Sequence, residues 1–392
     1  MSEWKKVKLG DYIDVLSGYA FKSKDFSDSG IPVIKIKNVC PPYISLDDLS
    51  YVPESIAFQN QRYILHKGDV LIAMTGSHIN QIASVVGRVG RVRYDDVTVL
   101  NQRVGKIVNK DDSRSSLDFI YYYLSQFEIK VELAQKAGGA ANQANISPAD
   151  IKELQFNCPP VEIQQRIATI LSRYDTLIEN YQKQIKLLEE AAQRLYKEWF
   201  VELRFPGHEN TKMVDGLPEG WERKKVGEIA PIKTGKKDAN FGTTDGVYPF
   251  FTCSQEPIKA PSYSFDANAV ILAGNGDFNV KLYRGKFEAY QRTYVLEPDD
   301  NALLYLLYFC ISENMNKLAS GASGSTIKFL TKGMIDSLEV FVPSNDIVTQ
   351  FNQYEESVQS KKERIQSQIR LLTESRDRLL PRLMGGEVKV KY

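Results

Sequence analysis

Two long stretches of the chain place apolar residues at the spacing of a helix that packs along its length. In the first stretch the apolar or aromatic positions are 163, 167, 170, 174, 177, 181, 185, 188, 192, 195 and 199. The steps alternate between four and three residues, as in coiled-coil heptads, with one additional step of four, a stutter that locally unwinds a supercoil. The second stretch has the same pattern, interrupted by Lys361 and Arg376, at Ile347, Phe351, Tyr354, Val358, Ile365, Ile369, Leu372, Leu379 and Leu383. The pattern predicts two long helices that pack against each other.

The second helix is a copy of the first. A shift of 184 positions aligns Ile151–Leu195 with Ile335–Leu379 without a gap. Each helix therefore has a matched partner in its own chain, which favours an intramolecular pair over the alternative, a dimerising coiled coil. At a rise of 1.5 Å per residue, a helix of this length is about 60 Å long. We interpret the pair as a rigid spacer between two similar domains.

The repeat extends into the regions before each helix. Trp4 and Gly18 recur at the same mutual spacing as Trp221 and Gly235, and the run 68–76 resembles the run 268–276. The offset between copies shrinks from 217 at the tryptophans to 184 at the helices, so the second globular region is shorter. Retained core elements with loops of variable length are typical of related domains.

Each globular region reads as mixed α/β. Short strand-like runs bounded by Gly, Asp and Asn are followed by an amphipathic helix, expected at 117–136 and 301–318. The strand-like runs are 32–36, 69–74, 84–92 and 97–108 in the first region and 248–252, 269–273, 281–283 and 293–296 in the second. We predict five segments, which are a first domain at 1–158, a long helix at 159–204, a linker at 205–220, a second domain at 221–342 and a second long helix at 343–386.

Composition favours a cytoplasmic protein. Apolar residues make up 43% of the chain and charged residues 25%, which is ordinary for a soluble globular protein. The first residues are not followed by an apolar core, so we expect no signal peptide, and the longest apolar run, 302–311, is too short to span a membrane. The cysteines are scattered, without the paired spacing of a zinc site, at Cys40, Cys158, Cys253 and Cys310.

The net charge of +1 does not by itself indicate a nucleic-acid-binding protein. If the chain binds DNA, its basic groups must gather on one face, or a partner must supply much of the phosphate contact.

We expect no catalytic or metal site and no cofactor in this chain. The run Asn157–Val161 superficially resembles the motif of adenine methyltransferases, but it has an inserted cysteine and lacks the aromatic residue. Gly274 and Gly276 lack the third glycine of a dinucleotide-binding loop. The three histidines form no metal-binding pair.

Polar loops flanked by glycine are the candidate DNA-binding elements of both regions. Asn and Gln can bridge the edge of adenine, and Arg or Lys can reach guanine, while glycine lets the backbone approach a phosphate. For any single residue, an ordinary surface loop is the simpler interpretation. The candidates are Thr75, Ser77, His78, Asn80, Gln81, Arg103, Asn142, Gln143, Asn145, Lys233, Lys236, Lys237, Asn275, Asn279, Arg292, Ser325, Thr326 and Lys328.

Gln102-Arg103 and Gln291-Arg292 recur in strand-like runs of the two regions. Because they recur, they are expected to serve an architecture common to both regions. Residues that read different bases should instead differ between the two.

Several short motifs occur in order and partly in duplicate. They are the two tryptophans with their glycine pairs, the run Leu217–Trp221, the loop ending at Thr326, the helix end Arg194–Phe200 and the terminal run Leu379–Met384. Together they resemble the specificity subunit of type I restriction–modification systems, over nearly the whole chain.

That resemblance implies two target recognition domains, each reading one half of a bipartite site in double-stranded DNA. It implies that the two helices pair as an antiparallel coiled coil, fix the spacing of the half-sites and bind two methyltransferase (modification) subunits, which restriction subunits join. The specificity subunit itself would have no enzymatic activity. S-adenosylmethionine, ATP and Mg would belong to the partner subunits.

Two other functions fit parts of the sequence. One is a coiled-coil scaffold that binds proteins without DNA specificity, and the other is a DNA methyltransferase with degenerate motifs. The missing cofactor glycines argue against the second.

Overall fold

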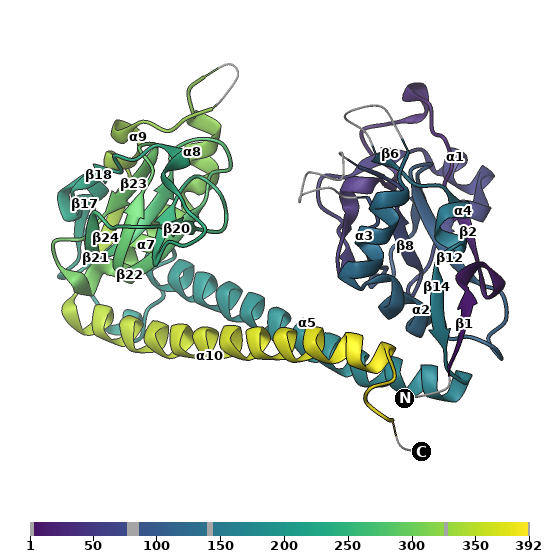
Figure 1. Ribbon diagram of the computed structural model, residues 1–392. Coiled ribbons are helices and arrows are strands. Elements are labelled where there is room, and N and C mark those ends of the chain that lie inside the picture. The colour runs from purple at the N-terminus through teal and green to yellow at the C-terminus, as the bar shows by residue number, and fades with distance from the viewer. Residues whose placement is uncertain (1–3, 77–85, 139–143, 325–327, 391–392) are drawn as a thin grey trace. The chain divides into compact units, whose positions relative to one another are not determined.

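The computed structural model describes residues 4–76, 86–138, 144–324 and 328–390, which form two compact units. Unit 1 comprises residues 1–180 and 368–392, and unit 2 comprises residues 181–367. Each unit contains a mixed α/β head, meaning the part of the unit outside the long helices, and one end of each long helix (Figure 1). The mixed α/β class and the duplication expected from the sequence are confirmed.

The head of unit 1 is built on two sheets. The larger has the strand order β2 (Ile13–Ser17), β12 (Val104–Asn109), β8 (Val70–Ala73), β10 (Val89–Arg91), β5 (Tyr43–Ile44) and β4 (Val39–Cys40). The smaller has the order β6 (Ser50–Val52), β3 (Ile31–Ile34), β11 (Thr98–Leu100) and β7 (Ile64–Leu65). Its α-helices are α1 (Glu54–Gln59), α2 (Leu117–Leu124), α3 (Phe127–Lys136) and α4 (Pro148–Lys152).

The head of unit 2 has one six-stranded sheet with equivalent central strands. Its order is β18 (Ile232–Thr234), β23 (Thr293–Leu296), β21 (Phe265–Ala273), β22 (Val280–Ala289), β19 (Tyr248–Phe251) and β20 (Ile258–Ala260). Its α-helices are α6 (Val226–Ile229), α7 (Leu304–Glu313), α8 (Met315–Gly321) and α9 (Lys332–Asp336). In both heads the central strand, β8 or β21, is bordered by antiparallel partners, and the next strand pairs in parallel with β5 or β19.

The central strands are buried on both faces, which explains their continuous apolar runs. Alternate side chains of β8 enter different clusters, so that Val70 and Ile72 pack with α2, whereas Leu71 and Ala73 pack on the opposite face. β21 does the same in unit 2, where Val270 and Leu272 pack with α7.

A two-stranded ladder ties the beginning of each head to its end. β1 (Lys5–Lys8), directly after Trp4, pairs antiparallel with β14 (Gln155–Cys158). β17 (Glu222–Lys225), directly after Trp221, pairs in the same way with β24 (Glu339–Val342). Because β14 and β24 lead into the long helices, each ladder fixes the head to the start of its own helix.

The long helices are α5 (Val161–Tyr196), continued by a π-helical turn at Lys197–Val201, and α10 (Asn345–Met384). In unit 1 the Arg376 guanidinium lies 2.8 Å from the Asp175 carboxylate. In unit 2 the Lys362 ammonium lies 2.7 Å from the Glu189 carboxylate. Glu189 is fourteen residues after Asp175, and Lys362 is fourteen residues before Arg376, so both ion pairs belong to one antiparallel register two heptads apart.

The buried face of α5 differs in detail from the predicted heptad seam. Leu177, which the pattern places in the seam, is 45% exposed, whereas the next residue, Ile178, is 6% exposed. Ile167 and Leu171 are fully buried among residues of the unit 1 head. The helix therefore buries a face wide enough to contact both its helical partner and the head, which a two-position heptad pattern does not describe.

The two ends of the helical pair are filled by different kinds of side chain at equivalent positions. In unit 2, Phe351 packs against the rings of Tyr196 and Phe200, with centroid distances of 6.3 Å and 4.8 Å. The equivalent positions in unit 1, 184 residues away, are Ile167, Leu380 and Met384, which join its apolar core. The sequence motifs 194–200 and 379–384 are therefore the same element in two versions.

Several predicted elements are interrupted. The run 97–108 is two strands, β11 and β12, separated by a turn at 101–103. The predicted helices 117–136 and 301–318 are each split, into α2 and α3 and into α7 and α8. At the breaks, the Ser125 hydroxyl donates to the Tyr121 carbonyl and the Asn314 amide donates to the Cys310 carbonyl. Such side-chain bonds compete with helix continuation.

The segment 205–220, predicted as a linker, packs on the head of unit 2. It contains a hairpin of β15 (Met213–Val214) and β16 (Leu217–Pro218), and Phe205 lies 4.9 Å from the Trp221 ring. Among the described residues, none of the helices is long and apolar enough to cross a membrane.

One buried carboxyl group interrupts the apolar end in unit 2. Glu355 on α10 is fully buried, and its two oxygens have no hydrogen-bond partner among the described residues. Burial raises its pKa to about 7, although the charge of Lys362 acts in the opposite direction. Burial is the main cause of the raised pKa of Tyr305 and of Tyr308 on α7, and the charge of Glu355 raises both further. The equivalent residue in unit 1 is Leu171, which is also fully buried.

We predict that Glu355→Leu stabilises the protein most at alkaline pH. Because the folded-state pKa is raised, the protonated carboxyl is favoured in the folded protein, and stability is lost as pH rises from 4.5 through 7. The expected loss in wild type is about 2–4 kcal/mol, and the variant should not show it.

Urea unfolding at pH 5 and pH 8 measures this difference. The control is Glu356→Gln, because the hydrogen bond from Arg284 lowers the pKa of Glu356. That variant should keep the wild-type loss of stability toward pH 8. An equal pH dependence in Glu355→Leu and wild type would show that Glu355 does not titrate in this range.

Candidate nucleic-acid interface

Four loop segments meet at one end of the unit 2 head. The Gly235 amide donates to the Thr293 carbonyl, and the Gln291 amide donates to the Lys237 carbonyl, at 3.1 Å and 2.9 Å. The Gly274 amide donates to the Arg292 carbonyl at 2.8 Å, and the Gly274 carbonyl accepts the Leu330 amide at 2.8 Å. In Figure 1, α9 and β18 mark this end, away from α10.

The same four segments meet in the unit 1 head through equivalent main-chain bonds. Gly18 donates to Val104, and Gln102 donates to Tyr19, at 3.1 Å and 2.9 Å. Met74 donates to Arg103, and Met74 accepts from Ile146, both at 2.9 Å. The two heads therefore share one main-chain framework, which we call the loop frame and define by residues 18–19, 74, 102–103 and 146 in unit 1 and 235–237, 274, 291–292 and 330 in unit 2.

The repeated glycines are required by the close approach of two main chains in this frame. A Cβ atom on Gly18 would lie 2.3 Å from the Asn101 carbonyl oxygen, and one on Gly235 would lie 2.1 Å from the Ala289 carbonyl oxygen. Atoms without a bond between them do not approach this closely, so only glycine fits. The sequence landmark shared by the two domains is thus explained by the loop frame.

Gln102-Arg103 and Gln291-Arg292 lie in turns of the loop frame, so their assignment to strands was wrong. The main chain at these positions bonds to the neighbouring segments and cannot continue a ladder. All four side chains are exposed. In unit 2 the Gln291 side-chain amide donates to the Asp238 carboxylate at 2.9 Å. This bond holds the turn that carries the adjacent Arg292.

A recess of about 500 Å³ lies at the loop frame of unit 2. The described residues of its wall include two cationic residues, Arg292 and Lys332, and none that is acidic. Gln291, Thr331 and Tyr294 supply further polar groups. This composition suits an anionic group such as a phosphate. Thr331 and Lys332 are not among the candidates predicted from the sequence, although they lie three and four residues after the candidate Lys328.

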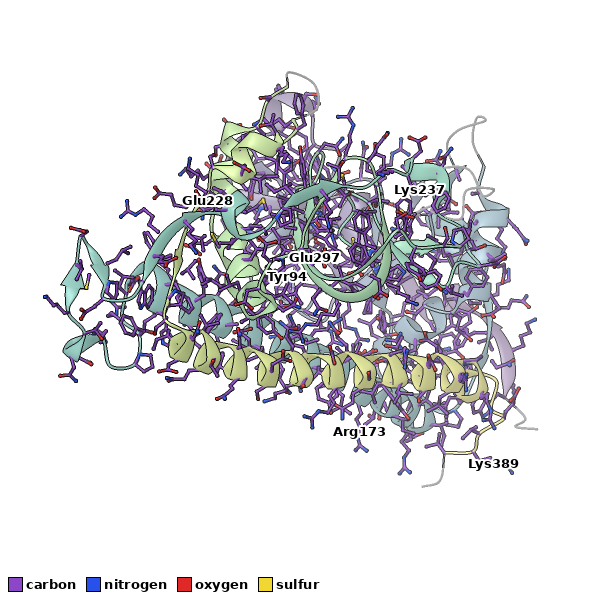
Figure 2. The ribbon with its side chains drawn as sticks, turned by 90° about the vertical axis from the view of Figure 1, so that its left-hand side faces the viewer. Tyr94, Arg173, Glu228, Lys237, Glu297 and Lys389 are labelled. Atoms are coloured by element: carbon purple, nitrogen blue, oxygen red, sulfur yellow. The ribbon has the colours of Figure 1, made fainter. Side chains whose placement is uncertain are left out.

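The remaining candidates of unit 2 have varied surroundings. Lys233 forms an ion pair with Glu297 at 3.1 Å, and Lys237 lies 4.4 Å from the Phe241 ring centroid. Lys237 and Glu297 are labelled in Figure 2. Lys236 and Lys328 are exposed.

Asn275 and Asn279 are occupied by structural hydrogen bonds. The Asn275 side-chain oxygen accepts from the Cys253 thiol, and the Asn279 amide donates to the Cys253 carbonyl at 3.1 Å. Both residues therefore shape the loop that follows β21.

In unit 1, Thr75 and Asn145 bond to each other. Thr75 is 5% exposed, and its hydroxyl donates to the Asn145 side-chain oxygen at 2.8 Å. The pair joins β9 (Thr75–Gly76) to β13 (Ala144–Asn145) and so supports the loop frame. Other candidates lie outside the described residues, namely Ser77, His78, Asn80, Gln81, Asn142, Gln143, Ser325 and Thr326.

Within the described residues, no group of three or more His, Cys, Asp or Glu side chains is arranged to hold a metal ion. The buried thiol of Cys310 has its pKa raised to about 11 by burial, which makes it a poor nucleophile.

The fold defines a protein with two related domains on a shared pair of antiparallel helices. The model of the family described as the type I restriction modification DNA specificity domain matches residues 1–190 and 218–370. The chain therefore belongs to this family, as the sequence motifs indicated, and its two heads are the DNA-recognition domains of a specificity subunit.

Relatives of the chain carry the same description. The EcoDI specificity subunit of Escherichia coli is 39% identical over 180 residues, which are 45% of this chain and 40% of that protein. The MjaIX specificity subunit of Methanocaldococcus jannaschii is 26% identical over 425 residues, covering 99% of this chain and 94% of that protein. The chain thus spans less than half of the first relative and nearly all of the second.

Among solved structures, the S subunit of a type I restriction–modification system from M. genitalium has the same fold. Its TM-score is 0.56 at 16% sequence identity, and the match covers 99% of this chain and 97% of that chain.

Proposed function

We propose that this chain is the sequence-recognition subunit of a type I restriction–modification complex that acts on a bipartite site in double-stranded DNA. Each head reads one half-site. The paired helices set the spacing and bind two methyltransferase subunits, and restriction subunits join that core. The observation that carries the proposal is the loop frame, which is repeated in both heads with different side chains around it.

A repeated frame with unlike side chains is what reading two different half-sites requires. Residues that hold neighbouring loops in place already differ at equivalent positions, as Thr75 differs from Asn275 and Asn145 from Phe329, while the main-chain bonds around them are the same. Sequence is read by side chains that contact base edges, whereas phosphate contacts set the position of the protein on the duplex. Arg103 and Arg292 are identical in both heads and cannot discriminate between half-sites, so we assign them to phosphates.

The helical pair supports two further parts of the proposal. An antiparallel pair of similar helices has an approximate two-fold axis, so it offers the same surface twice, which suits two copies of one partner. A helix of about 60 Å limits the separation of the half-sites to fewer than about 18 base pairs. We expect half-sites about one helical turn of DNA apart.

The catalytic steps, methylation and DNA cleavage, would be carried out by the partner subunits. We propose that the modification subunits methylate adenine with S-adenosylmethionine, and that ATP and Mg serve the restriction subunits. This chain would act without a cofactor, in the cytoplasm. Compared with a protein-binding scaffold, DNA recognition better explains the cationic recess at Arg292 and Lys332, because a scaffold has no use for it.

A map of methylated adenines in cells with and without the gene tests the proposal. We expect loss of one bipartite motif on deletion and its return on complementation. An unchanged map, together with failure of the chain to co-purify with methyltransferase subunits, would exclude the proposed function.

We predict that Arg292→Ala and Arg103→Ala each weaken DNA binding by the assembled methyltransferase about equally for all sequences. Loss of one phosphate contact should also reduce the slope of log affinity against log salt by about one. Fluorescence anisotropy at several salt concentrations, with cognate and altered DNA, measures both effects.

The matched control is Lys224→Ala, because Lys224 lies on β17 beside the helix start and already pairs with Glu222 at 2.7 Å. Its salt slope should equal that of wild type. If Arg292→Ala instead changed the preferred base at one position, Arg292 would be a base-reading residue.

We predict that insertion of four residues after Tyr181 changes the gap between half-sites or prevents assembly. Four residues rotate the later part of α5 and move its apolar face out of register with α10. Methylation mapping reports the gap, and co-purification reports assembly. An insertion of the same length in the loop at 243–246 is the control and should change neither. Unchanged methylation sites in the helix variant would mean that the helices do not set the gap.

A further inference from the structure

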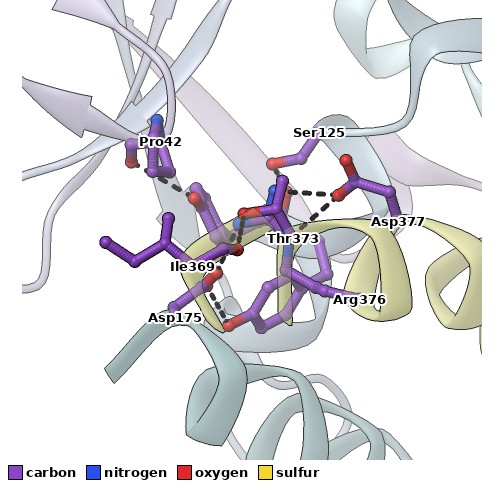
Figure 3. A network of polar contacts seen from close by, with 9 residues as sticks. Pro42, Ser125, Asp175, Ile369, Thr373, Arg376 and Asp377 are labelled. Carbon is purple, nitrogen blue, oxygen red and sulfur yellow. Dashed lines mark hydrogen bonds and ion pairs between the residues drawn. The ribbon is translucent and has the colours of Figure 1, made fainter. Parts of the chain in front are cut away.

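A single buried carboxylate connects three separate parts of unit 1. Asp175 on α5 is 1% exposed. Its Oδ1 accepts a hydrogen bond from Arg376 Nη1 of α10 at 2.8 Å, and its Oδ2 accepts one from the Tyr122 hydroxyl of α2 at 2.6 Å. We call these three residues the junction network. Figure 3 shows Arg376 between Asp175 and the more exposed Asp377, to which it also bonds at 2.8 Å.

Tyr122 and Arg376 are the two hydrogen-bond donors of this network. Burial, followed by the charge of Asp175, raises the pKa of the Tyr122 hydroxyl, so that Tyr122 keeps its proton and donates. The guanidinium of Arg376 remains charged at any ordinary pH. Asp175 thus receives two hydrogen bonds, one from the head and one from the other long helix.

The junction network explains an irregularity in the sequence. Arg376 occupies a position of the heptad pattern in α10 where an apolar residue is expected. A buried ion pair gives little net stability compared with apolar residues, because both charges must be desolvated. Polar residues in a helical seam instead specify register, since they penalise every arrangement that separates them from their partner.

A slip of one heptad would separate Asp175 from Arg376. If α10 moved by seven residues along α5, Asp175 would face position 369 or 383 in place of Arg376. These residues are Ile369 and Leu383, so the buried carboxylate would lose its cation in either direction. Away from the helix ends and the stutter, a heptad slip returns many apolar residues to apolar partners, so the buried charge adds a penalty that seam packing alone does not supply.

The network occurs at one end of the helical pair only. The equivalents of Asp175, Tyr122 and Arg376 in unit 2, 184 residues away, are Gln359, Leu306 and Ala192. Leu306 and Ala192 are each 2% exposed, so apolar packing replaces the charged contact there. A second ion pair between the helices, from Lys362 to Glu189, lies at the same register, but the Glu189 side chain is 54% exposed and is easily solvated.

We propose that the junction network fixes the register of α5 against α10 and thereby the length of the gap between the half-sites. Asp175, Tyr122 and Arg376 are positioning residues and do not contact DNA. The second part of this inference rests on the proposed function, whereas the first part is a property of the chain alone. A slip of one heptad is about 10 Å along the helix, which corresponds to about three base pairs.

The test replaces the network by apolar residues in a triple variant, Tyr122→Phe, Asp175→Leu and Arg376→Leu. Two spin labels report the register independently of DNA, one at Gln165 on α5 and one at Arg370 on α10, both exposed positions of unit 1. The native cysteines are replaced by serine so that only these positions are labelled. Pulsed electron–electron double resonance measures the distance between the two labels and should give one distance in wild type. The triple variant should give an additional distance, which corresponds to a shift of about 10 Å along the helix.

Methylation mapping of the same variants, co-expressed with modification subunits, tests the consequence for DNA. The triple variant should methylate a second motif with unchanged half-sites and a gap that differs by about three base pairs. A Glu189→Gln and Lys362→Gln double variant is the matched control, and it should show one distance and one gap.

A single unchanged distance in the triple variant would overturn the register inference. If the triple variant does not fold, Asp175→Asn provides the same test with nearly unchanged shape, and it should give the second distance as a minor population. An additional distance without an additional gap would overturn only the link to DNA spacing. A wild-type chain that supports no bipartite methylation would instead refute the proposed function.

Discussion

The antiparallel pairing of α5 with α10 is the constraint on which the rest of the structure depends. Each head enters its long helix directly from a strand, β14 or β24, and that strand pairs with the first strand of the same head. A head therefore cannot change its attachment without breaking its own terminal ladder. The ion pairs at Asp175 and Glu189 lie two heptads apart, and both fit a single antiparallel register of α5 and α10. Apolar burial drives the pairing, but burial alone accepts several registers, and charged groups are needed to select one.

The two heads share one main-chain arrangement at the loop frame, whereas the side chains around it differ. Equivalent amide and carbonyl groups hold the loop frame in both heads, and glycine at 18 and 235 permits the close approach that the frame needs. Side chains in the frame serve it in different ways. Thr75 and Asn145 bond to each other in unit 1, whereas Asn275 receives the Cys253 thiol in unit 2. A constant frame with variable surroundings lets the same domain present different surfaces to DNA without a change in its core.

The sequence predicted much of the architecture because repetition and periodicity are properties of a chain read in order. Both long helices, the duplicated heads and the apolar central strands follow from patterns of three to four residues or from identity at a fixed offset. The turn at Arg103 did not follow, because it is held by the Met74 amide, which donates to Arg103, and by the Tyr19 carbonyl, which accepts from Gln102, and both are distant in sequence. The burial of Asp175 was hidden for the same reason, since its partners Tyr122 and Arg376 lie 53 and 201 residues away. Lys332 was missed because a recess is formed by several segments and leaves no local pattern.

The approximate symmetry of the helical pair makes its asymmetric polar groups informative. Unit 1 buries the charged contact of Asp175 where unit 2 has Gln359, and unit 2 buries Glu355 where unit 1 has Leu171. An unpaired buried carboxyl destabilises a fold, and a buried ion pair stabilises it little, so neither is explained by stability. A charged contact at one end and a titratable carboxyl at the other make the two ends chemically distinct. The duplicated chain therefore uses apolar residues to pair its two copies and buried polar residues to distinguish them.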